Sequence, residues 1–160
     1  MSAMAVALMS TAAIAASTGS ASATTYAKFE NANSHLCLAI PAESTANGTE
    51  AIQWSCDSNG TDQLWALDYI GTSNQFHIRN AFSQDCLGIG GSSKEKGQYA
   101  IQWPCDGAVD QVWQADSTGR LWNVHSQLCL SVPSASTTPG VKVIQWTCES
   151  VTSNPEQKWA

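Results

Sequence analysis

Short apolar runs separated by polar clusters make up most of the chain. No segment holds apolar residues at helical spacing for more than about two turns. Between the runs stand clusters of Gly, Ser, Asn and Pro, which are typical of turns between strands. The pattern therefore predicts an all-β protein, with strands over residues 26–31, 37–40, 51–54, 63–67, 76–80, 86–89, 99–103, 111–114, 121–124, 129–132, 141–146 and 157–159.

The same pattern of residues occurs three times along the chain. Each copy begins with Cys-Leu-x-Ile or Cys-Leu-x-Val, carries Ile-Gln-Trp just before a second cysteine, and ends with Gln-x-Trp. A glycine stands 11 positions after the first cysteine in every copy: Gly48, Gly97 and Gly140. Self-similarity of this kind indicates a repeat architecture. The predicted repeats span about residues 24–72, 73–117 and 118–160.

The six cysteines form three pairs, and the members of each pair are 19 positions apart. Since the pairing follows the repeat, we predict three disulfides within the repeats: Cys37–Cys56, Cys86–Cys105 and Cys129–Cys148. Zinc is the alternative use of paired cysteines, but no Cys-x-x-Cys motif or neighbouring histidine supports it. We therefore expect no metal site and no cofactor.

Composition narrows the possible partners. The net charge is −6 with only 7 Lys and Arg residues, which are scattered, so nucleic acid and anionic membranes are not expected partners. Residues 1–23 carry no charge and end in Ala21-Ser22-Ala23, which predicts a secretory signal peptide cleaved after Ala23. The mature protein, residues 24–160, is expected to be secreted, soluble and monomeric.

Three repeats of four short strands are too small to bury separate cores, so they must pack around one shared axis. The predicted product is one domain, a closed barrel with pseudo-threefold symmetry, in which closure removes exposed sheet edges.

The residues that repeat also resemble a known family. The three Cys-Leu starts, the three Trp-x-Cys segments and the three Gln-x-Trp ends are similar to those of the ricin-type β-trefoil lectins, over essentially all of residues 24–160. The resemblance implies a β-trefoil of three four-stranded repeats, carbohydrate binding, no catalysis and no required metal.

Six tryptophans occupy repeat positions and form two sets. Trp65, Trp113 and Trp159 follow the glutamines Gln63, Gln111 and Gln157 by two positions, and we expect these tryptophans in the core and the glutamines bonded to nearby backbone. Trp54, Trp103 and Trp146 precede the second cysteine of each repeat. The pattern alone leaves core packing and sugar stacking open for the second set. The resemblance favours stacking, because the family commonly places its sugar-binding aromatic at this position.

The chain departs from the family at the residues that would bind sugar hydroxyls. Sugar-binding members typically carry Asp after Cys-Leu, whereas this chain has Ala39, Gly88 and Ser131. Before Gln-x-Trp the family typically has Asn, and this chain has Asp62, Asp110 and Glu156. These carboxylates can accept hydrogen bonds from hydroxyls or can be solvated turn residues. A galactose-type site of the usual kind is therefore expected to be absent or altered in every repeat.

No residue pattern singles out an enzyme. His35, His77 and His125 fall near equivalent turns without a matched nucleophile, and no pair of acids has the spacing of a glycosidase dyad, so we expect solvated loop residues. Two hypotheses follow: a secreted, non-enzymatic carbohydrate-binding module, or a trefoil that binds proteins, such as a protease inhibitor or a subunit of a secreted complex. The expected sugar contacts are Trp54, Asp62, Trp103, Asp110, Trp146 and Glu156. Repeat one is the best single site, with the Asn47-Gly48 loop expected beside Trp54.

Overall fold

The computed structural model describes residues 24–150 and 152–160, so the predicted signal peptide lies outside the described residues. Its strands are β1 (Tyr26–Ala27), β2 (Cys37–Ala39), β3 (Ile52–Trp54), β4 (Trp65–Tyr69), β5 (Gln75–Asn80), β6 (Cys86–Ile89), β7 (Ala100–Trp103), β8 (Trp113–Ala115), β9 (Leu121–Asn123), β10 (Cys129–Ser131) and β11 (Ile144–Trp146). Six 3-10 turns complete it: η1 (Pro41–Glu43), η2 (Thr61–Gln63), η3 (Gly90–Ser92), η4 (Val109–Gln111), η5 (Pro133–Ala135) and η6 (Pro155–Gln157).

A closed ring of paired strands forms the barrel. Antiparallel pairing runs from β1 to β4, then to β5, β8 and β9. The ring closes through the end of the chain, where Lys158 pairs with Arg120 and Trp159 pairs with Asn31. Glu30 and Ala160 exchange two backbone hydrogen bonds at this closure, at 2.8 and 3.0 Å. The predicted all-β β-trefoil is therefore confirmed.

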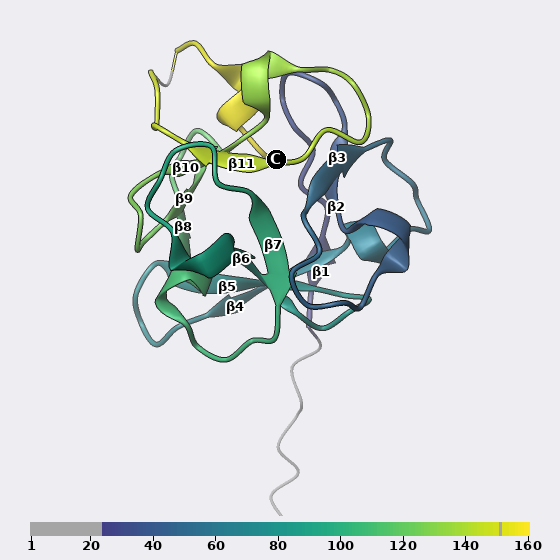
Figure 1. Ribbon diagram of the computed structural model, residues 1–160, viewed down its shortest axis with the longest axis vertical. Coiled ribbons are helices and arrows are strands. Elements are labelled where there is room, and N and C mark those ends of the chain that lie inside the picture. The colour runs from purple at the N-terminus through teal and green to yellow at the C-terminus, as the bar shows by residue number, and fades with distance from the viewer. Residues whose placement is uncertain (1–23, 151) are drawn as a thin grey trace, which may run out of the picture.

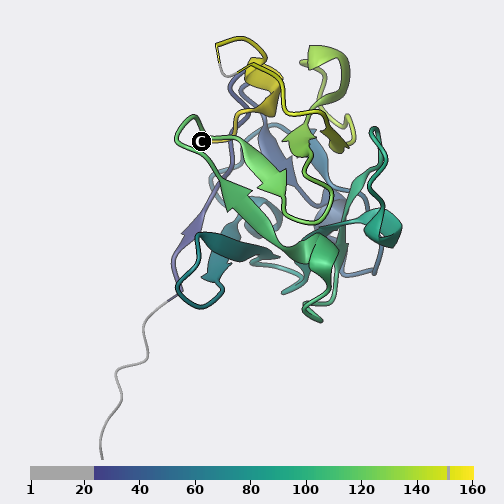
Figure 2. The same cartoon turned by 90° about the vertical axis from the view of Figure 1, so that its left-hand side faces the viewer.

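The remaining strands form three hairpins, β2–β3, β6–β7 and β10–β11, grouped around the centre of the molecule (Figure 1 and, from the side, Figure 2). Isolated bridges join neighbouring hairpins: Glu50 to Ile101, Tyr99 to Ile144, and Lys142 to Ile52. Glu50, Tyr99 and Lys142 each lie two positions after the repeated glycine. Lys142 forms an ion pair with Glu50, and its Nζ lies 5.0 Å from the centre of the Tyr99 ring. The equivalent positions of the three repeats thus hold an acidic, an aromatic and a basic side chain, which contact one another where the repeats join.

The first set of tryptophans lies in the core, as predicted. Trp65, Trp113 and Trp159 are buried, and each indole N–H donates to the carbonyl of the leucine that follows the first cysteine of its repeat, at 2.8 to 3.1 Å. The leucines Leu38, Leu87 and Leu130 belong to the same core cluster. The Cys-Leu start and the Gln-x-Trp end of each repeat are therefore held together by one buried hydrogen bond.

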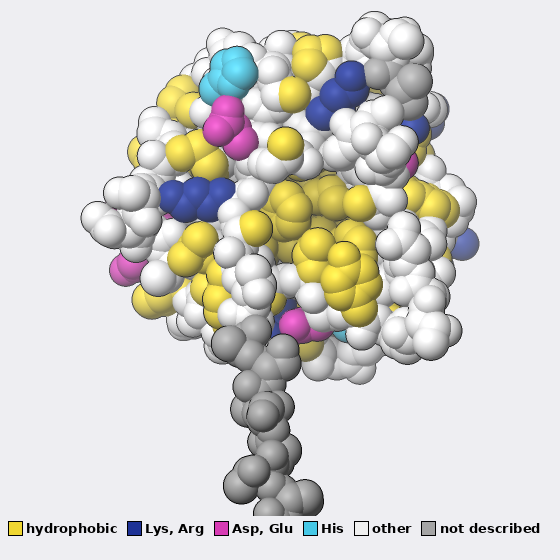
Figure 3. All heavy atoms as spheres, turned by 180° about the vertical axis from the view of Figure 1, so that it is seen from behind, with side chains coloured by type: hydrophobic (Ala, Val, Ile, Leu, Met, Phe, Trp, Pro, Cys, Tyr) yellow, Lys and Arg dark blue, Asp and Glu magenta, His cyan; other side chains and the backbone are white. Residues whose placement is uncertain are grey.

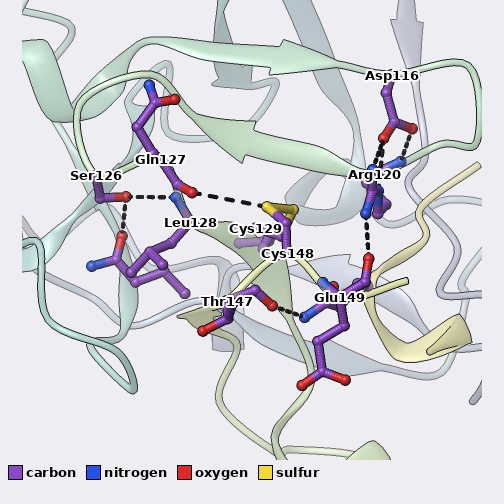
Figure 4. The surroundings of a disulfide bond; sticks show 12 residues. Asp116, Arg120, Ser126, Gln127, Leu128, Cys129, Thr147, Cys148 and Glu149 are labelled. Carbon is purple, nitrogen blue, oxygen red and sulfur yellow. Dashed lines mark hydrogen bonds and ion pairs between the residues drawn. A yellow bond between two sulfur atoms is a disulfide. The ribbon is translucent and has the colours of Figure 1, made fainter. Parts of the chain in front are cut away.

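All three predicted disulfides are present, with Cα–Cα distances of 5.0 to 5.1 Å. Figure 4 shows the bond between Cys129 and Cys148, which ties β10 to the segment after β11. Beside it, Arg120 donates from Nε to Asp116 at 2.7 Å and also contacts the carbonyl oxygen of Glu149. Each disulfide closes a loop of about 20 residues and contributes roughly 3 kcal/mol to the free energy of unfolding in the chain-entropy model.

The prediction was wrong about the segments that hold the glutamines of the three Gln-x-Trp ends. Residues 63, 111 and 157 were expected at the start of strands, but they end the 3-10 turns η2, η4 and η6. The reason is side-chain hydrogen bonding. Each glutamine donates to the backbone carbonyl just after the tryptophan that precedes the second cysteine, from Gln63 to Ser55, Gln111 to Pro104 and Gln157 to Thr147, all at 2.8 Å. The expected bonding of these glutamines to backbone is confirmed.

Candidate functional site

Each repeat forms one hollow between its 3-10 turns and its hairpin. Strand register sets the common layout, because Ala39 lies opposite Ile52 and Cys37 lies opposite Trp54 on the same hairpin. The residue after Cys-Leu and the exposed tryptophan therefore share one face. Gly88 with Ile101, and Ser131 with Ile144, repeat this register in the other two hairpins.

The hollow of repeat one is the largest, at about 920 Å³. Ala39 and Ile52 line its floor, Trp54 stands at its rim, and Asp62 of η2 lies within it. The structure therefore brings the two predicted contacts Trp54 and Asp62 together. Two further carboxylates, Glu43 of η1 and Asp57, line the same hollow and were not predicted.

The hollow of repeat two is the smallest, at about 250 Å³, and is lined by Trp103 and Asp110 among others. Its carboxylate differs from that of Asp62, because Asp110 is only 7% exposed. Asp110 Oδ1 accepts from the Ser92 hydroxyl at 2.6 Å, and Oδ2 accepts from the backbone N–H of Ile89 at 3.1 Å. Asp110 is therefore neither a solvated turn residue nor a free acceptor.

Repeat three has a hollow of about 450 Å³ that contains Trp146, Glu149 and Glu156. The predicted pair of Trp146 and Glu156 is therefore also brought together. Lys96, which belongs to repeat two, places its Nζ 6.0 Å from the centre of the Trp146 ring. A cation beside this indole distinguishes repeat three from the other two repeats.

The second set of tryptophans is exposed, which decides the question that the sequence pattern left open. Trp54, Trp103 and Trp146 are 49%, 42% and 40% exposed. Indole rings with such exposed fractions present a flat apolar face to a ligand. Their role as sugar contacts stays a prediction, but core packing is excluded.

Each exposed tryptophan also lies beside a glycine of another repeat. A Cβ atom added to Gly140 would lie 3.4 Å from Trp54, and one added to Gly48 or Gly97 would lie 3.9 Å from Trp103 or Trp146. These glycines have φ of 82 to 85°, a backbone conformation that favours glycine. The Asn47-Gly48 loop was expected beside Trp54, and this was wrong, because the loop packs on the next repeat.

The glutamine before each exposed tryptophan holds the neighbouring loop in place. Gln53 donates to the carbonyls of Ser136 and Thr138, both at 2.9 Å, and it is fully buried. The same two donations run from Gln102 to Ser44 and Ala46, and from Gln145 to Ser93 and Glu95. The hairpin that carries each exposed tryptophan is therefore held to a loop of another repeat.

The charge of the repeat-one hollow is negative and partly shielded from water. Burial raises the pKa of the Asp62 carboxyl, and repulsion from Glu43 and Asp57 adds to the rise, while a hydrogen bond from the backbone N–H of Asp62 itself and the charge of Lys28 oppose it. In the described part of the chain, no other residue donates a hydrogen bond to this carboxylate. Asp62 is thus bonded only by its own backbone N–H and can still accept from a ligand beside the exposed indole.

A fourth hollow, of about 700 Å³, lies outside the repeat pattern. Phe29, Leu67 and Tyr69 line it together with Thr24 and Thr25, where the described chain begins. Figure 3 shows hydrophobic side chains gathered on this side of the molecule, close to the same point. Tyr69 is 63% exposed and packs edge-to-face on Phe76.

The residues considered for catalysis or metal binding do not form a cluster. In residues 24–150 and 152–160, no group of three or more His, Cys, Asp or Glu side chains could hold a metal ion. His35 pairs with Glu30 on the surface at 2.9 Å. His77 lies in β5, within the strand predicted over residues 76–80, and it is half-buried and not solvated as expected, with Nδ1 3.0 Å from the carbonyl oxygen of Gln111. Nor does this part of the chain contain a helix with the length and apolar character that crossing a bilayer needs.

Comparison with known families decides how this fold is classified. The model of the ricin-type β-trefoil lectin domain matches residues 25–159. The chain belongs to this family. The resemblance predicted from the Cys-Leu, Trp-x-Cys and Gln-x-Trp residues is therefore confirmed, and the protein is a domain of the carbohydrate-binding, generally non-enzymatic lectin kind. None of the curated proteins compared with this ricin-type domain matches it.

Solved structures support the same classification. The designed threefold-symmetric protein ThreeFoil is 30% identical, with a TM-score of 0.77 over 84% of this chain and 95% of its own. An exo-β-1,3-galactanase from Clostridium thermocellum is 27% identical over 86% of this chain, with a TM-score of 0.75, but only 30% of that enzyme is covered. The C-terminal half of an earthworm R-type lectin, solved with GalNAc, shares the fold at 14% identity, with a TM-score of 0.64 over 84% of this chain and 95% of its own.

Proposed function

We propose that this protein is a secreted, non-enzymatic carbohydrate-binding module that binds sugar in the hollow of repeat one. The observation that carries the proposal is an exposed indole beside an acceptor to which no other described residue donates: Trp54, 49% exposed, and the Asp62 carboxylate line one hollow of about 920 Å³. The apolar face of a sugar ring would stack on Trp54. A sugar hydroxyl would donate to Asp62, and hydrogen bonds to a charged acceptor are the stronger kind.

The mode of binding differs from that of a galactose-type site. The carboxylate that typically follows Cys-Leu in the family is replaced in repeat one by Ala39, which is 1% exposed and carries no acceptor. In our proposal Asp62, which lines the same hollow, takes its place as acceptor. The earthworm lectin half is described with GalNAc, and the galactanase acts on a β-1,3-galactan, so galactose-based sugars are the first class to test.

Secretion is part of the proposal and rests on two observations. Three disulfides in a chain of 160 residues fit an oxidising compartment. Residues 1–23 have the uncharged, small-residue composition of a signal peptide. Secretion is tested by expressing the full chain with a reporter and sequencing the N-terminus of the exported protein, which we expect to be Thr24.

Retention on immobilised polysaccharides and a glycan array tests the binding proposal. We expect the wild type to be retained and Trp54→Ala to lose about tenfold or more in affinity, since stacking on an indole contributes about 1.5 kcal/mol or more. Trp65→Phe is not a suitable control because its indole bonds Leu38 in the core, whereas Tyr99→Phe changes an exposed ring outside the hollow. If the wild type is retained on nothing, or Trp54→Ala binds as the wild type does, the proposal is wrong.

The exposed apolar side of the molecule favours a second candidate. Phe29, Leu67 and Tyr69 line a hollow of about 700 Å³ that contains no part of the repeat-one site. A trefoil that binds another protein would use such a surface. A blank glycan array together with a single secreted protein retained by the wild type, and lost on Tyr69→Ser, would support this function instead.

A further inference from the structure

The carboxylate before Gln-x-Trp has two different positions in the three repeats. Asp62 and Glu156 are half-buried, and in the described chain no other residue donates a hydrogen bond to either carboxylate. Asp110 is buried and accepts two hydrogen bonds. The hollow that contains Asp110 is also the smallest of the three, at about 250 Å³ against 450 and 920 Å³.

Gly88 is what makes the buried position possible. A Cβ atom on residue 88 would lie 2.8 Å from Asp110 Oδ2, closer than such atoms approach, so the carboxylate occupies space that any other residue would need. Ala39 and Ser131 carry a Cβ atom at the equivalent positions of repeats one and three. The backbone N–H that follows shows the difference: Ile89 donates to the Asp110 side chain, whereas Ile40 and Val132 donate to the backbone carbonyls of Asp62 and Glu156.

Ser92 is the second requirement. Its hydroxyl donates to Asp110 Oδ1 at 2.6 Å, from the last position of η3. The equivalent positions of η1 and η5 hold Glu43 and Ala135. Alanine has no donor, and the Glu43 carboxylate repels Asp62. Only repeat two therefore has both a glycine, Gly88, that leaves room for the carboxylate and a hydroxyl, that of Ser92, that donates to it.

We infer that Asp110 closes the floor of the repeat-two hollow, so that Gly88 and Ser92 weaken sugar binding in repeat two. The inference rests on the proposed function and sharpens it: repeat one carries the binding, and repeat two retains an exposed Trp103 without a free acceptor. The ligand loses the charge-assisted hydrogen bond, worth about 1.5 kcal/mol or more, so repeat two binds at least about tenfold more weakly than repeat one.

Indole N–H signals in the NMR spectrum of the ¹⁵N-labelled protein, residues 24–160, provide a test for each repeat separately. The signals are assigned by single Trp→Phe replacements, and the probes are lactose, N-acetylgalactosamine, cellotetraose and xylotetraose. In the wild type we expect the Trp54 signal to shift at a sugar concentration at least about tenfold below any shift of the Trp103 signal.

Two variants open the hollow and one keeps it closed. Ser92→Ala removes the hydroxyl that holds the carboxylate, and Gly88→Ala displaces the carboxylate, so both should free an acceptor beside Trp103 and shift its signal at about tenfold lower sugar concentration. Because a Cβ at residue 88 would also lie 3.1 Å from Cγ of the buried Gln111, Gly88→Ala can impair folding, and Ser92→Ala, which places alanine where repeat three already has Ala135, then carries the test. Asp110→Asn is the matched control. Its amide accepts from Ile89 and donates to Ser92, so the floor stays closed and Trp103 should respond as in the wild type.

The outcomes separate the inference from the proposed function. Equal midpoints for Trp54 and Trp103 in the wild type, or a Trp103 response that is identical in Ser92→Ala and Asp110→Asn, overturn the inference and leave sugar binding intact. If none of the probes shifts any indole signal, the proposed function fails and the inference fails with it.

Discussion

The interlocking glutamines yield a stability prediction that compares one repeat with another. Gln53 makes three side-chain hydrogen bonds: it donates to Ser136 and Thr138 and accepts from the Ser34 hydroxyl at 2.7 Å. Gln102 makes the same two donations, but its buried Oε1 has no partner in the described chain. Both side chains are fully buried, so replacement by alanine removes the same packing from each site.

The expected costs follow from these hydrogen bonds. Gln53→Ala removes three bonds worth about 1 kcal/mol each, or about 3 kcal/mol of unfolding free energy before packing is counted. Gln102→Ala removes two bonds but also an unpaired buried carbonyl, whose burial costs about 1 kcal/mol or more, so the net loss is about 1 kcal/mol. The difference of about 2 kcal/mol corresponds to about thirtyfold in the unfolding equilibrium.

Urea unfolding of both variants, with the disulfides intact, measures this difference. The slopes of the unfolding curves should match, because the two variants expose the same surface on unfolding. Ser34→Ala provides the control background: there Gln53 keeps its two donations and has an unpaired carbonyl, so the further cost of Gln53→Ala should fall close to that of Gln102→Ala. The bond that Ser34 accepts from Leu36 is lost from both members of that comparison and cancels. Equal costs for Gln53→Ala and Gln102→Ala would refute the hydrogen-bond argument.

Three further predictions concern charge and cross-links. Burial alone would raise the pKa of Asp116, but hydrogen bonds from Thr118 and Arg120 outweigh it and lower that pKa to about 2. Asp116→Asn should therefore reduce the free energy of unfolding by about 2 kcal/mol at pH 7. In urea titrations this difference from the wild type should vanish as the pH falls through about 2. Burial raises the pKa of Asp62, so folding favours its protonated form and the stability of the protein declines as the pH rises through that pKa. In thermal melting, Asp62→Asn should therefore be more stable than the wild type at pH 7 and equal to it well below pH 4. Its sugar affinity should be lower and independent of pH between about 4 and 7. Replacing Cys37 and Cys56 by alanine should lower the unfolding free energy by about 3 kcal/mol, and an unchanged urea midpoint would contradict this.

The core of the fold could be predicted because each of its parts is repeated in the sequence. Leu38, Trp65 and the Cys37–Cys56 disulfide have counterparts at matching positions in the other two repeats. A residue that occurs three times in register must satisfy three equivalent environments, and in one small domain those environments are the shared core and its cross-links.

The turns and the contacts between repeats could not be predicted in the same way. Gln63 ends a 3-10 turn because its amide bonds Ser55, and this tertiary contact overrides the apolar alternation that predicted a strand. Gly140 lies beside Trp54 because each loop crosses to another repeat. The repeated glycine was visible in the sequence, but a cyclic exchange of loops has no signature in the order of residues along one chain.

The acidic positions show the same limit within the candidate site. Asp62 and Asp110 occupy equivalent places in the sequence, yet one can still accept from a ligand and the other is buried. The difference depends on Gly88 and Ser92, which lie about 20 residues away in the chain and adjoin Asp110 only in the fold. Sequence position alone could therefore nominate both carboxylates but could not distinguish them.

A crystal structure of the complex with the best sugar from the glycan array tests the central claim most directly. Our account predicts a sugar ring stacked on Trp54, with a hydroxyl within hydrogen-bond distance of the Asp62 carboxylate and no sugar in the repeat-two hollow. Sugar bound in the hollow of Phe29 and Tyr69 instead, with that of Trp54 empty, would contradict it.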